Sequence, residues 1–249
     1  MSVIKPGVTS LHHFFRSGPM PCPYLSGRIE RKLFTRLSGP DAEALNSTLS
    51  QAGFRRSHDI IYRPVCPDCR ACVPVRIPVS RFSPGRTMRR TRRANADLSM
   101  TERPPRASLE QFHMFQQYQQ SRHGDSDMAR MSRADYAAMI EEGSVASTLQ
   151  EFRAPSGALV GAMLSDRLAD GYSAVYSFFD PSLPERSLGT YMVMALVDEA
   201  TAQGLPHVYL GYWIAGSRKM SYKTRFRPLE ALTDEGWREL SDAPPASRG

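Results

Sequence analysis

The second half of the sequence alternates between extended and helical patterns in an order that few architectures accommodate. Three segments that read as strands follow one another, separated by the short turn sequences P-S-G and D-G. A long apolar helix comes next and ends at Gly204, and a further strand follows it directly. Because short turns join antiparallel neighbours, the first three strands are expected to form a meander. The strands are expected over 145–152, 158–168, 172–179 and 207–213, and the helix over 188–204.

This order of three strands, a helix and a strand predicts an α+β fold with a mostly antiparallel sheet flanked by helices. It is the order expected of an N-acetyltransferase-like (GNAT-type) acyltransferase core. The proline-rich run E-R-P-P-R at 102–106 marks a boundary before that core. We therefore expect an N-terminal half over 1–105 that contains the cysteines, a catalytic half over 106–240 and a disordered tail over 241–249.

Three of the four cysteines lie in the run Y-R-P-V-C-P-D-C-R-A-C-V-P-V-R at 62–76. Two residues separate Cys66 from Cys69 and Cys69 from Cys72, as in the ligand runs of iron-sulfur proteins, and Cys22 is the candidate for a fourth ligand. The spacing favours an iron-sulfur cluster or zinc. Four reduced thiols packed in a small core would give the same pattern, so this choice stays open. A thiol nucleophile is disfavoured because no Cys/His signature accompanies the run. The segment that follows, 73–79, alternates apolar residues with Pro74, Arg76 and Pro78, which predicts a strand at the edge of a sheet.

Basic residues outnumber acidic ones, with 32 Lys and Arg against 25 Asp and Glu, which gives a net charge of +7. This balance favours an anionic partner. The excess is concentrated in 81–106, where arginines far outnumber acidic residues. Arginine binds phosphate in a planar, bidentate way, so the segment is expected to contact nucleic acid, with a solvated basic face as the alternative. The arginines at the centre of this segment are Arg86, Arg89, Arg90, Arg92 and Arg93.

The N-terminal residues contain no unbroken apolar region and no small-residue cleavage site. No run approaches the roughly 18 apolar residues that a membrane span needs. We therefore expect a cytoplasmic protein without a membrane partner. In that reducing compartment, cysteines serve as thiols or ligands before they form disulfides.

The segment R-S-L-G-T at 186–190 opens the long helix, where backbone amides and the helix dipole can hold an anion or a polarised carbonyl. It is similar to a degraded form of the R-x-x-G-x-G/A loop of coenzyme-A acyltransferases, but Tyr191 stands where the last small residue belongs. This difference disfavours a coenzyme-A donor. A tight helix start that needs Gly for packing is the alternative. The candidate oxyanion donors are the amides of Leu188, Gly189 and Thr190.

Two further features flank this loop. Asp180 ends the third strand, where a carboxylate can orient an incoming amine or accept its proton, although a D-P pair is also a common turn. The run Y-L-G-Y-W-I-A-G-S-R-K-M-S-Y-K-T-R-F-R-P at 209–228 interleaves aromatic and basic side chains. Aromatic rings stack on bases, and cations bind phosphate or carboxylate. The run is therefore expected to bind an RNA end or an acidic peptide.

Four segments together resemble the aminoacyl-tRNA-protein transferases, and more closely the bacterial aspartate/glutamate leucyltransferases than the eukaryotic arginyltransferases. They span nearly the full chain, and the second and fourth are the most specific. The segments are C-P-Y-L-S-G-R at 22–28, G-F-R-R-S-H-D-I-I-Y-R-P-V-C-P-D-C-R-A-C-V-P-V-R at 53–76, S-L-G-T-Y at 187–191, and Y-L-G-Y-W-I with S-R-K-M-S-Y-K-T-R-F-R-P-L-E at 209–230.

The resemblance implies an aminoacyltransferase that moves leucine from leucyl-tRNA to the N-terminal amine of proteins beginning with Asp or Glu, which marks them for degradation. It also implies a fold related to the acetyltransferases. The aminoacyl ester is already activated, so the chemistry requires no cofactor. Positioning and oxyanion stabilisation would supply most of the rate.

Under this resemblance the candidate residues divide between three roles. Asp180 would orient the acceptor amine or act as its base, with the amides of Leu188, Gly189 and Thr190 at the oxyanion. Acidic acceptors would be bound by Arg28, Arg63, Arg76, Lys219 and Tyr222. The tRNA would be bound by Arg86, Arg89, Arg90, Arg92, Arg93, Arg186 and Lys223. The competing classes are a metal-dependent nucleic-acid-binding module and a transferase that uses arginyl-tRNA or acetyl-CoA.

Overall fold

An eight-stranded sheet forms the centre of the computed structural model, which describes residues 11–124 and 126–240. The expected tail over 241–249 lies outside the described residues. The strands are β7 (Val73–Pro78), β8 (Ser99–Arg103), β9 (Ser147–Arg153), β10 (Leu159–Leu168), β11 (Gly171–Phe179), β12 (His207–Trp213), β13 (Glu230–Thr233) and β14 (Gly236–Glu239). Their spatial order is β14-β13-β7-β12-β11-β10-β9-β8, and every neighbouring pair is antiparallel except β11 and β12.

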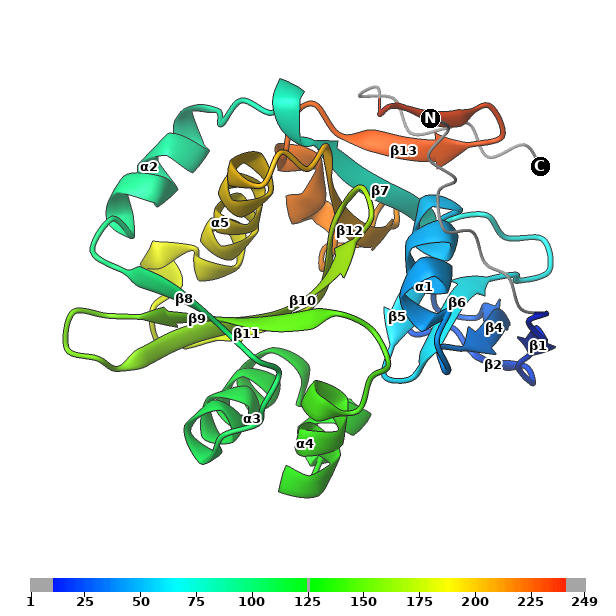
Figure 1. Cartoon of the computed structure of the whole chain (residues 1–249), viewed down its shortest axis with the longest axis horizontal. Coiled ribbons are helices and arrows are strands. Elements are labelled where there is room, and N and C mark those ends of the chain that lie inside the picture. Colours follow the sequence, from blue (N-terminus) through cyan, green and yellow to red (C-terminus); the bar gives the residue numbers. More distant parts are fainter. Residues whose placement is uncertain (1–10, 125, 241–249) are drawn as a thin grey trace.

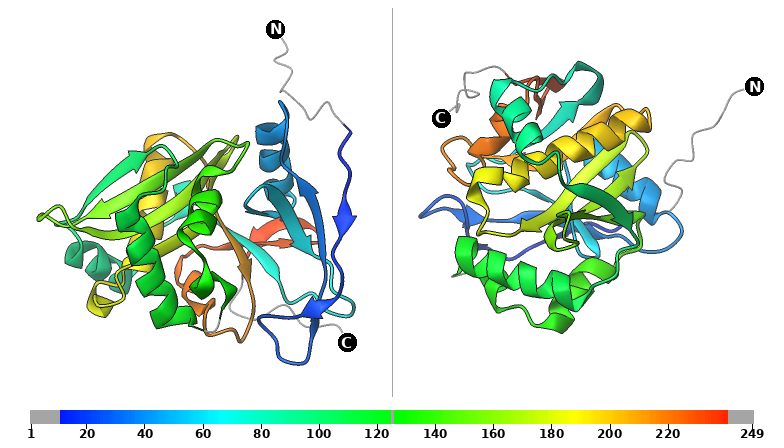
Figure 2. Two further views of the ribbon diagram at one scale, coloured as in Figure 1. Left: turned by 90° about the horizontal axis from the view of Figure 1, so that it is seen from below. Right: turned by 90° about the vertical axis from the view of Figure 1, so that its left-hand side faces the viewer.

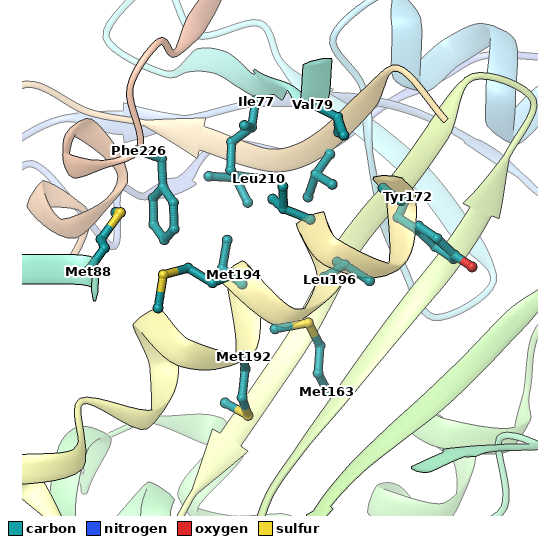
Figure 3. Packing of buried hydrophobic residues seen from close by; sticks show 14 of the residues in the cluster. Ile77, Val79, Met88, Met163, Tyr172, Met192, Met194, Leu196, Leu210 and Phe226 are labelled. Carbon is teal, nitrogen blue, oxygen red and sulfur yellow. The ribbon is translucent and has the colours of Figure 1, made fainter. Parts of the chain in front are cut away.

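Helices cover both faces of this sheet (Figure 1). One face carries α2 (Arg86–Ala94) and α5 (Leu188–Ala202), and the other carries α3 (Leu109–His123) and α4 (Arg133–Glu141). Each face has its own buried core, since successive residues of a strand point to opposite sides. Figure 3 shows the core on the α5 side, where Met192, Met194 and Leu196 lie close to Leu210 and Met163 of the sheet. None of the helices in the described part of the chain is long and apolar enough to cross a membrane.

The elements expected in the second half are confirmed, with small shifts at their ends. β9, β10 and β11 form the antiparallel meander, and α5 begins at Leu188. Because α5 carries the chain from the end of β11 back to the start of β12, these two strands run parallel. The expectation of a mixed fold with a mostly antiparallel sheet is therefore confirmed.

The N-terminal strands form a second sheet beside the central one (Figure 2). The strands of this sheet are, in spatial order, β1 (Phe15–Arg16), β4 (Lys32–Arg36), β6 (Ile60–Pro64) and β5 (Arg55–Ser57); nearby lie α1 (Ala42–Gln51) and the pair β2 (Met20–Pro21) and β3 (Ile29–Glu30). The chain then enters the central sheet through β7 and β8. The central sheet thus contains strands from both sides of the expected boundary at residue 105, and the division into two halves stays a prediction.

Short 3-10 helices link several of these elements. They are η1 (Val79–Arg81), η2 (Asp127–Arg130), η3 (Pro184–Arg186) and η4 (Ser221–Arg225). η3 leads directly into α5, and η4 follows β12, so both flank the ends of the parallel strand pair.

β7 lies inside the central sheet, between β12 and β13. The prolines of this strand predict an edge position, and that prediction is wrong. On the β13 side, only Val75 and Arg76 are paired. Pro74 and Pro78 lie outside this short ladder, so their missing N–H groups interrupt no hydrogen bond to β13.

A buried ion pair joins the N-terminal sheet to the central sheet. Arg56 of β5 donates from Nε and Nη2 to the two carboxylate oxygens of Asp166 on β10, each at 2.6 Å. Ser147 donates to the same carboxylate at 2.7 Å, and Asn46 of α1 at 3.4 Å. The side chains of Arg56 and Asp166 are 3% and 0% exposed. Bidentate geometry and the added donors satisfy the carboxylate, so this pair fixes β5 against β10.

Lys223 of η4 is a second buried cation. Its residue is 4% exposed, and its Nζ donates to the carbonyl oxygen of Tyr212 on β12. Burial first, and then the positive charge of Arg55, hold the pKa of Lys223 well below its ordinary value. Lys223 is one of the residues expected to bind tRNA; in this structure its amine is buried and bonded to a backbone carbonyl, and the tRNA role stays a prediction.

We expect Asp166→Ala to lower the free energy of unfolding by about 3–5 kcal/mol, because it leaves the Arg56 charge buried and unpaired. The double variant Arg56→Met/Asp166→Leu removes both charges and should lose less than Asp166→Ala. Denaturant unfolding measures both values. Arg36→Gln, on an arginine whose side chain is 75% exposed, is the control and should change stability by no more than about 0.5 kcal/mol. A loss below about 1 kcal/mol for Asp166→Ala would contradict the anchoring role.

The lowered pKa of Lys223 predicts how pH acts on stability. Between the folded pKa and about 10.4, the unfolded chain carries one proton more at this residue, so stability rises with pH. The wild-type protein should therefore gain stability relative to Lys223→Met as pH rises from 7 to 10, by at most about 1.4 kcal/mol per pH unit. Unfolding at several pH values measures the difference. Lys219→Met, at an exposed lysine, should show no such slope, and a flat difference for Lys223→Met would contradict the prediction.

Candidate active site

The central sheet opens where β11 and β12 separate. The two strands pair only between Gly171–Ser173 and His207–Tyr209. β11 then continues to Phe179 and β12 to Trp213 without pairing to each other. Carbonyl groups that face such an opening lack a ladder partner, so other donors must satisfy them.

Arg55 of β5 reaches across this strand opening. Its Nη2 donates to the carbonyl oxygen of Val175 on β11 at 2.8 Å. On the opposite side it packs against Gly211 of β12, where an added Cβ would lie 2.9 Å from Cδ of Arg55. Gly211 also has a φ of +70°, which residues with side chains rarely adopt. Glycine is therefore needed at this position for Arg55 to pass β12 and reach β11.

Lys223 supplies a hydrogen bond to a backbone carbonyl of β12, the other strand at the opening. Its amine donates to the carbonyl of Tyr212 on β12, as the Arg55 guanidinium does to Val175 on β11. The two cations are close enough for the charge of Arg55 to lower the pKa of Lys223 further. Arg55 also lines a small pocket together with Ser173, where the pairing of β11 and β12 ends.

Three tyrosines lie near enough to Arg55 for its charge to act on their pKa values. Burial raises the pKa values of Tyr176, Tyr212 and Tyr222, and the positive charge of Arg55 opposes that rise in each of them. These phenols come from β11, β12 and η4, so three separate elements face the same charge. Tyr222, which the sequence places in acceptor binding, belongs to this group. Its pKa also responds to Tyr118 of α3, which adds a fourth element.

The other cations expected to bind an acidic acceptor are exposed or already paired. Arg28, Arg63 and Lys219 are exposed. Arg76 is half-buried, but its Nε donates to the carboxylate of Glu230 at 2.8 Å. That carboxylate balances the charge of Arg76. The cation that lies in the strand opening is Arg55, which is not among the acceptor-binding residues expected from the sequence.

The four cysteines gather where the chain enters β7. Burial first, and then the thiols of Cys66, Cys22 and Cys69, raise the pKa of Cys72 to about 12. All four are half-buried free cysteines. Within residues 11–124 and 126–240, no group of three or more His, Cys, Asp or Glu side chains is placed to hold a metal ion. The cysteines in this arrangement therefore do not form the ligand set that zinc or an iron-sulfur cluster requires.

Asp180 lies just beyond β11, and its carboxylate closes a turn. It accepts hydrogen bonds from the backbone N–H and the hydroxyl of Ser182, at 2.8 and 2.6 Å. These bonds are the turn contacts that a D-P pair favours. The residue is half-buried.

The start of α5 offers fewer free amides than the sequence indicates. The Thr190 amide donates to the carbonyl of Ser187 at 3.0 Å. The amides of Leu188 and Gly189 occupy the first turn, where N–H groups have no partner within the helix. An added Cβ on Gly189 would lie 3.0 Å from Cε1 of Phe179, so the packing of α5 on β11 also needs this glycine.

The arginines expected to bind tRNA lie mainly on α2. Arg92 pairs with Asp198 of α5 at 2.8 Å, and Arg186 with Asp97 at 2.9 Å, so both bonds tie α2 and its following loop to α5. The remaining four are exposed and have no carboxylate partner in the described part of the chain; they are Arg86, Arg89, Arg90 and Arg93. They form the exposed basic face of α2.

Arg55 is the functional candidate that sequence reasoning missed. It stands next to Arg56 in the run G-F-R-R-S-H, and the run does not show which arginine is paired. The available signal is the period of two along a strand: neighbouring residues face opposite sides, so both arginines cannot share one buried partner.

Comparison with known proteins places both parts of the chain in one family. Residues 20–90 match the family described as arginine-tRNA-protein transferase, N terminus, and residues 110–233 match its C terminus. Two solved structures show weak likeness: L-PGS from Bacillus licheniformis, with a TM-score of 0.44 and 12% identity over 58% of this chain and 46% of that one, and FemX, with a TM-score of 0.43 and 10% identity over 84% and 81%.

Named relatives match at much higher identity. The aspartate/glutamate leucyltransferase of Paramagnetospirillum magneticum is 56% identical over 230 residues, which covers 92% of this chain and 94% of the relative. The enzyme of the same name from Rhodospirillum rubrum is 56% identical over 227 residues, which covers 91% and 92%. The two family matches together, and each of these relatives, cover most of the chain, and the chain belongs to the arginine-tRNA-protein transferase family.

Proposed function

We propose that this protein transfers leucine from leucyl-tRNA to the N-terminal amine of proteins that begin with Asp or Glu. The observation that carries the proposal is the identity of 56% to an aspartate/glutamate leucyltransferase over nearly the full length of both chains. The proposed substrates are found in the cytoplasm, which is therefore the proposed location. The added leucine would mark the acceptor for degradation.

The arrangement of the central sheet supports an acyltransferase core of the acetyltransferase type. An antiparallel meander leads into one parallel pair, β11 and β12, which α5 connects and which separates after three residue pairs. An opening of this kind gives an acyl group and an attacking amine access to backbone groups inside the sheet. The half-buried cation and the tyrosines at the opening then orient what enters.

The reaction joins an amine to an activated ester. The acceptor nitrogen attacks the ester carbonyl, the new C–N bond forms, the C–O bond to the tRNA ribose breaks, and the nitrogen releases a proton. An α-amine with a pKa of about 8 is available near neutral pH, so no covalent enzyme intermediate is needed. Aminoacyl-tRNA is the co-substrate, and the ester itself supplies the activation.

Two features near the start of α5 are proposed to assist this step. The amides of Leu188 and Gly189 point from the first turn of α5, where the helix dipole favours negative charge on an oxyanion. The Thr190 amide is engaged by Ser187, so its contribution would require that bond to break. Asp180 is proposed to orient the amine, with Ser182 holding its carboxylate in place.

The exposed basic face of α2 is proposed to bind the tRNA backbone. Its four arginines have no carboxylate partner in the ranges that the structure describes, so their charges are available to phosphates. Arg92 and Arg186 hold α2 against α5 through ion pairs. These ion pairs give the basic face a fixed position relative to the start of α5.

A transfer assay tests the proposed function. The protein is given a peptide that begins with Asp and, in parallel reactions, one of three donors: leucyl-tRNA, arginyl-tRNA or acetyl-CoA. The product is identified by mass. We expect leucine addition and no acetylation. Arginine or acetyl addition in its place would contradict the proposed donor, and product from none of the three would contradict the transferase. In the same assay, normal turnover by Asp180→Asn would exclude Asp180 as the amine-orienting group.

Salt dependence tests the proposed tRNA surface. The triple variant Arg86→Gln/Arg90→Gln/Arg93→Gln should bind leucyl-tRNA more weakly, because it loses phosphate contacts. Each lost contact should also lower the slope of log Kd against log salt concentration by about 0.7–0.9. Binding titrations at several salt concentrations measure the slope. Arg36→Gln, on the exposed side of β4, is the control. An unchanged slope in the triple variant would place the tRNA elsewhere.

A further inference from the structure

Two neighbouring arginines on β5 have opposite electrostatic situations. Arg56 is fully buried and makes a bidentate ion pair with Asp166. Arg55 is half-buried and has no carboxylate partner in the described part of the chain. A guanidinium held partly out of water without a counter-ion is unfavourable unless a ligand supplies the charge. Arg55 is therefore a residue that packing alone does not explain.

The position of Arg55 leaves most of its donors available. A guanidinium has five N–H donors, and the bond to the carbonyl of Val175 uses one of them. The contact with Gly211 fixes the aliphatic stem, so the head group has a defined place in the strand opening. A rigid fork of this kind matches two oxygens of one carboxylate.

The surroundings favour an anion that carries a single charge. Lys223 is the other basic residue at the opening, but it is buried and its amine already donates to the carbonyl oxygen of Tyr212. Burial and the charge of Arg55 also lower its pKa, so a positive charge on Lys223 is disfavoured there and Arg55 is the main cation available to a ligand. The tyrosines whose pKa values respond to Arg55 supply apolar ring surface near it, and the hydroxyl of Tyr212 is already bonded to the carbonyls of Gly53 and Tyr62. A carboxylate fits this balance better than a phosphate dianion.

We propose that Arg55 binds the side-chain carboxylate of the acceptor's N-terminal Asp or Glu, an inference that rests on the function proposed above. Of the cations considered for this role, Arg28, Arg63 and Lys219 are exposed, and Arg76 is neutralised by Glu230. Arg55 alone among these five is half-buried and without a carboxylate partner in the described residues. It also lies in the opening between β11 and β12, the strands that α5 connects.

This role makes Arg55 the origin of discrimination against neutral acceptors. An N-terminal Asn has nearly the shape of Asp but carries no charge. Binding it would leave the guanidinium half-buried without a counter-ion, and a site that loses its polar partner rejects the analogue strongly. The same reasoning applies to Gln against Glu.

The test compares two peptides that differ only in beginning with Asp or Asn. We expect Arg55→Gln to lower kcat/KM for the Asp peptide by about 10- to 100-fold and to leave the value for the Asn peptide nearly unchanged, so that the ratio collapses. Arg55→Lys keeps the charge but loses the bidentate fork, and its ratio should fall between wild type and Arg55→Gln. The KM for leucyl-tRNA should stay the same in all three proteins.

A control variant and the pattern of losses decide the outcome. Arg36→Gln, at an exposed arginine of β4, should retain the wild-type ratio. Arg63→Gln tests the competing assignment, and a collapse of the ratio in that variant in place of Arg55→Gln would overturn the inference. An equal loss with both peptides, or a raised KM for leucyl-tRNA at an unchanged ratio, would also overturn it by showing a packing or tRNA role. If Arg55→Gln fails to fold, the ratio of Arg55→Lys decides, because an unchanged ratio contradicts the bidentate contact. A wild-type protein that transfers no leucine to either peptide refutes the proposed function itself.

Discussion

The buried ion pair between Arg56 and Asp166 is the contact on which the candidate site depends. It holds β5 of the small sheet against β10 of the central sheet with two bonds of 2.6 Å. Removing charges from water is costly, and this pair repays the cost only because its geometry is bidentate and Ser147 adds a further donor. Since strand residues alternate in direction, fixing Arg56 inward also fixes Arg55 toward the strand opening. One interaction thus anchors the fold and aims the adjacent side chain.

The separation of β11 and β12 creates a second requirement. Two inward carbonyls, of Val175 and Tyr212, lose the ladder partners that a continuous sheet would give them, and each receives its hydrogen bond from a cationic side chain, Arg55 or Lys223. A neutral donor would satisfy these carbonyls equally well. Hydrogen bonding to the carbonyl of Val175 therefore does not by itself account for the arginine at this position. Arg55 also brings a positive charge to the opening.

Local patterns predicted the elements of the second half, because apolar periodicity and turn residues act over short stretches of chain. α5 begins at Leu188 as expected, and β9, β10 and β11 form the expected meander. The predictions that failed concern partners far apart in sequence. Proline in β7 indicated an edge, yet β13 covers it over 150 residues later. Similarly, a basic run does not reveal that Lys223 is buried beneath β12, or that Arg55 lacks the carboxylate that its neighbour Arg56 has.

The proposed acceptor site has consequences for how the chain is divided. Arg55 comes from the N-terminal sheet, whereas Val175, Gly211 and Lys223 come from beyond residue 105. If the chain were divided at that residue, the C-terminal part would lack Arg55 in its strand opening. The N-terminal part would lack Val175 and Gly211, the residues that Arg55 contacts. The two parts are also tied by Arg56 and Asp166. The proposed acceptor pocket therefore requires both parts of the chain, docked as Arg56 and Asp166 hold them, and the small sheet is a component of that proposed site.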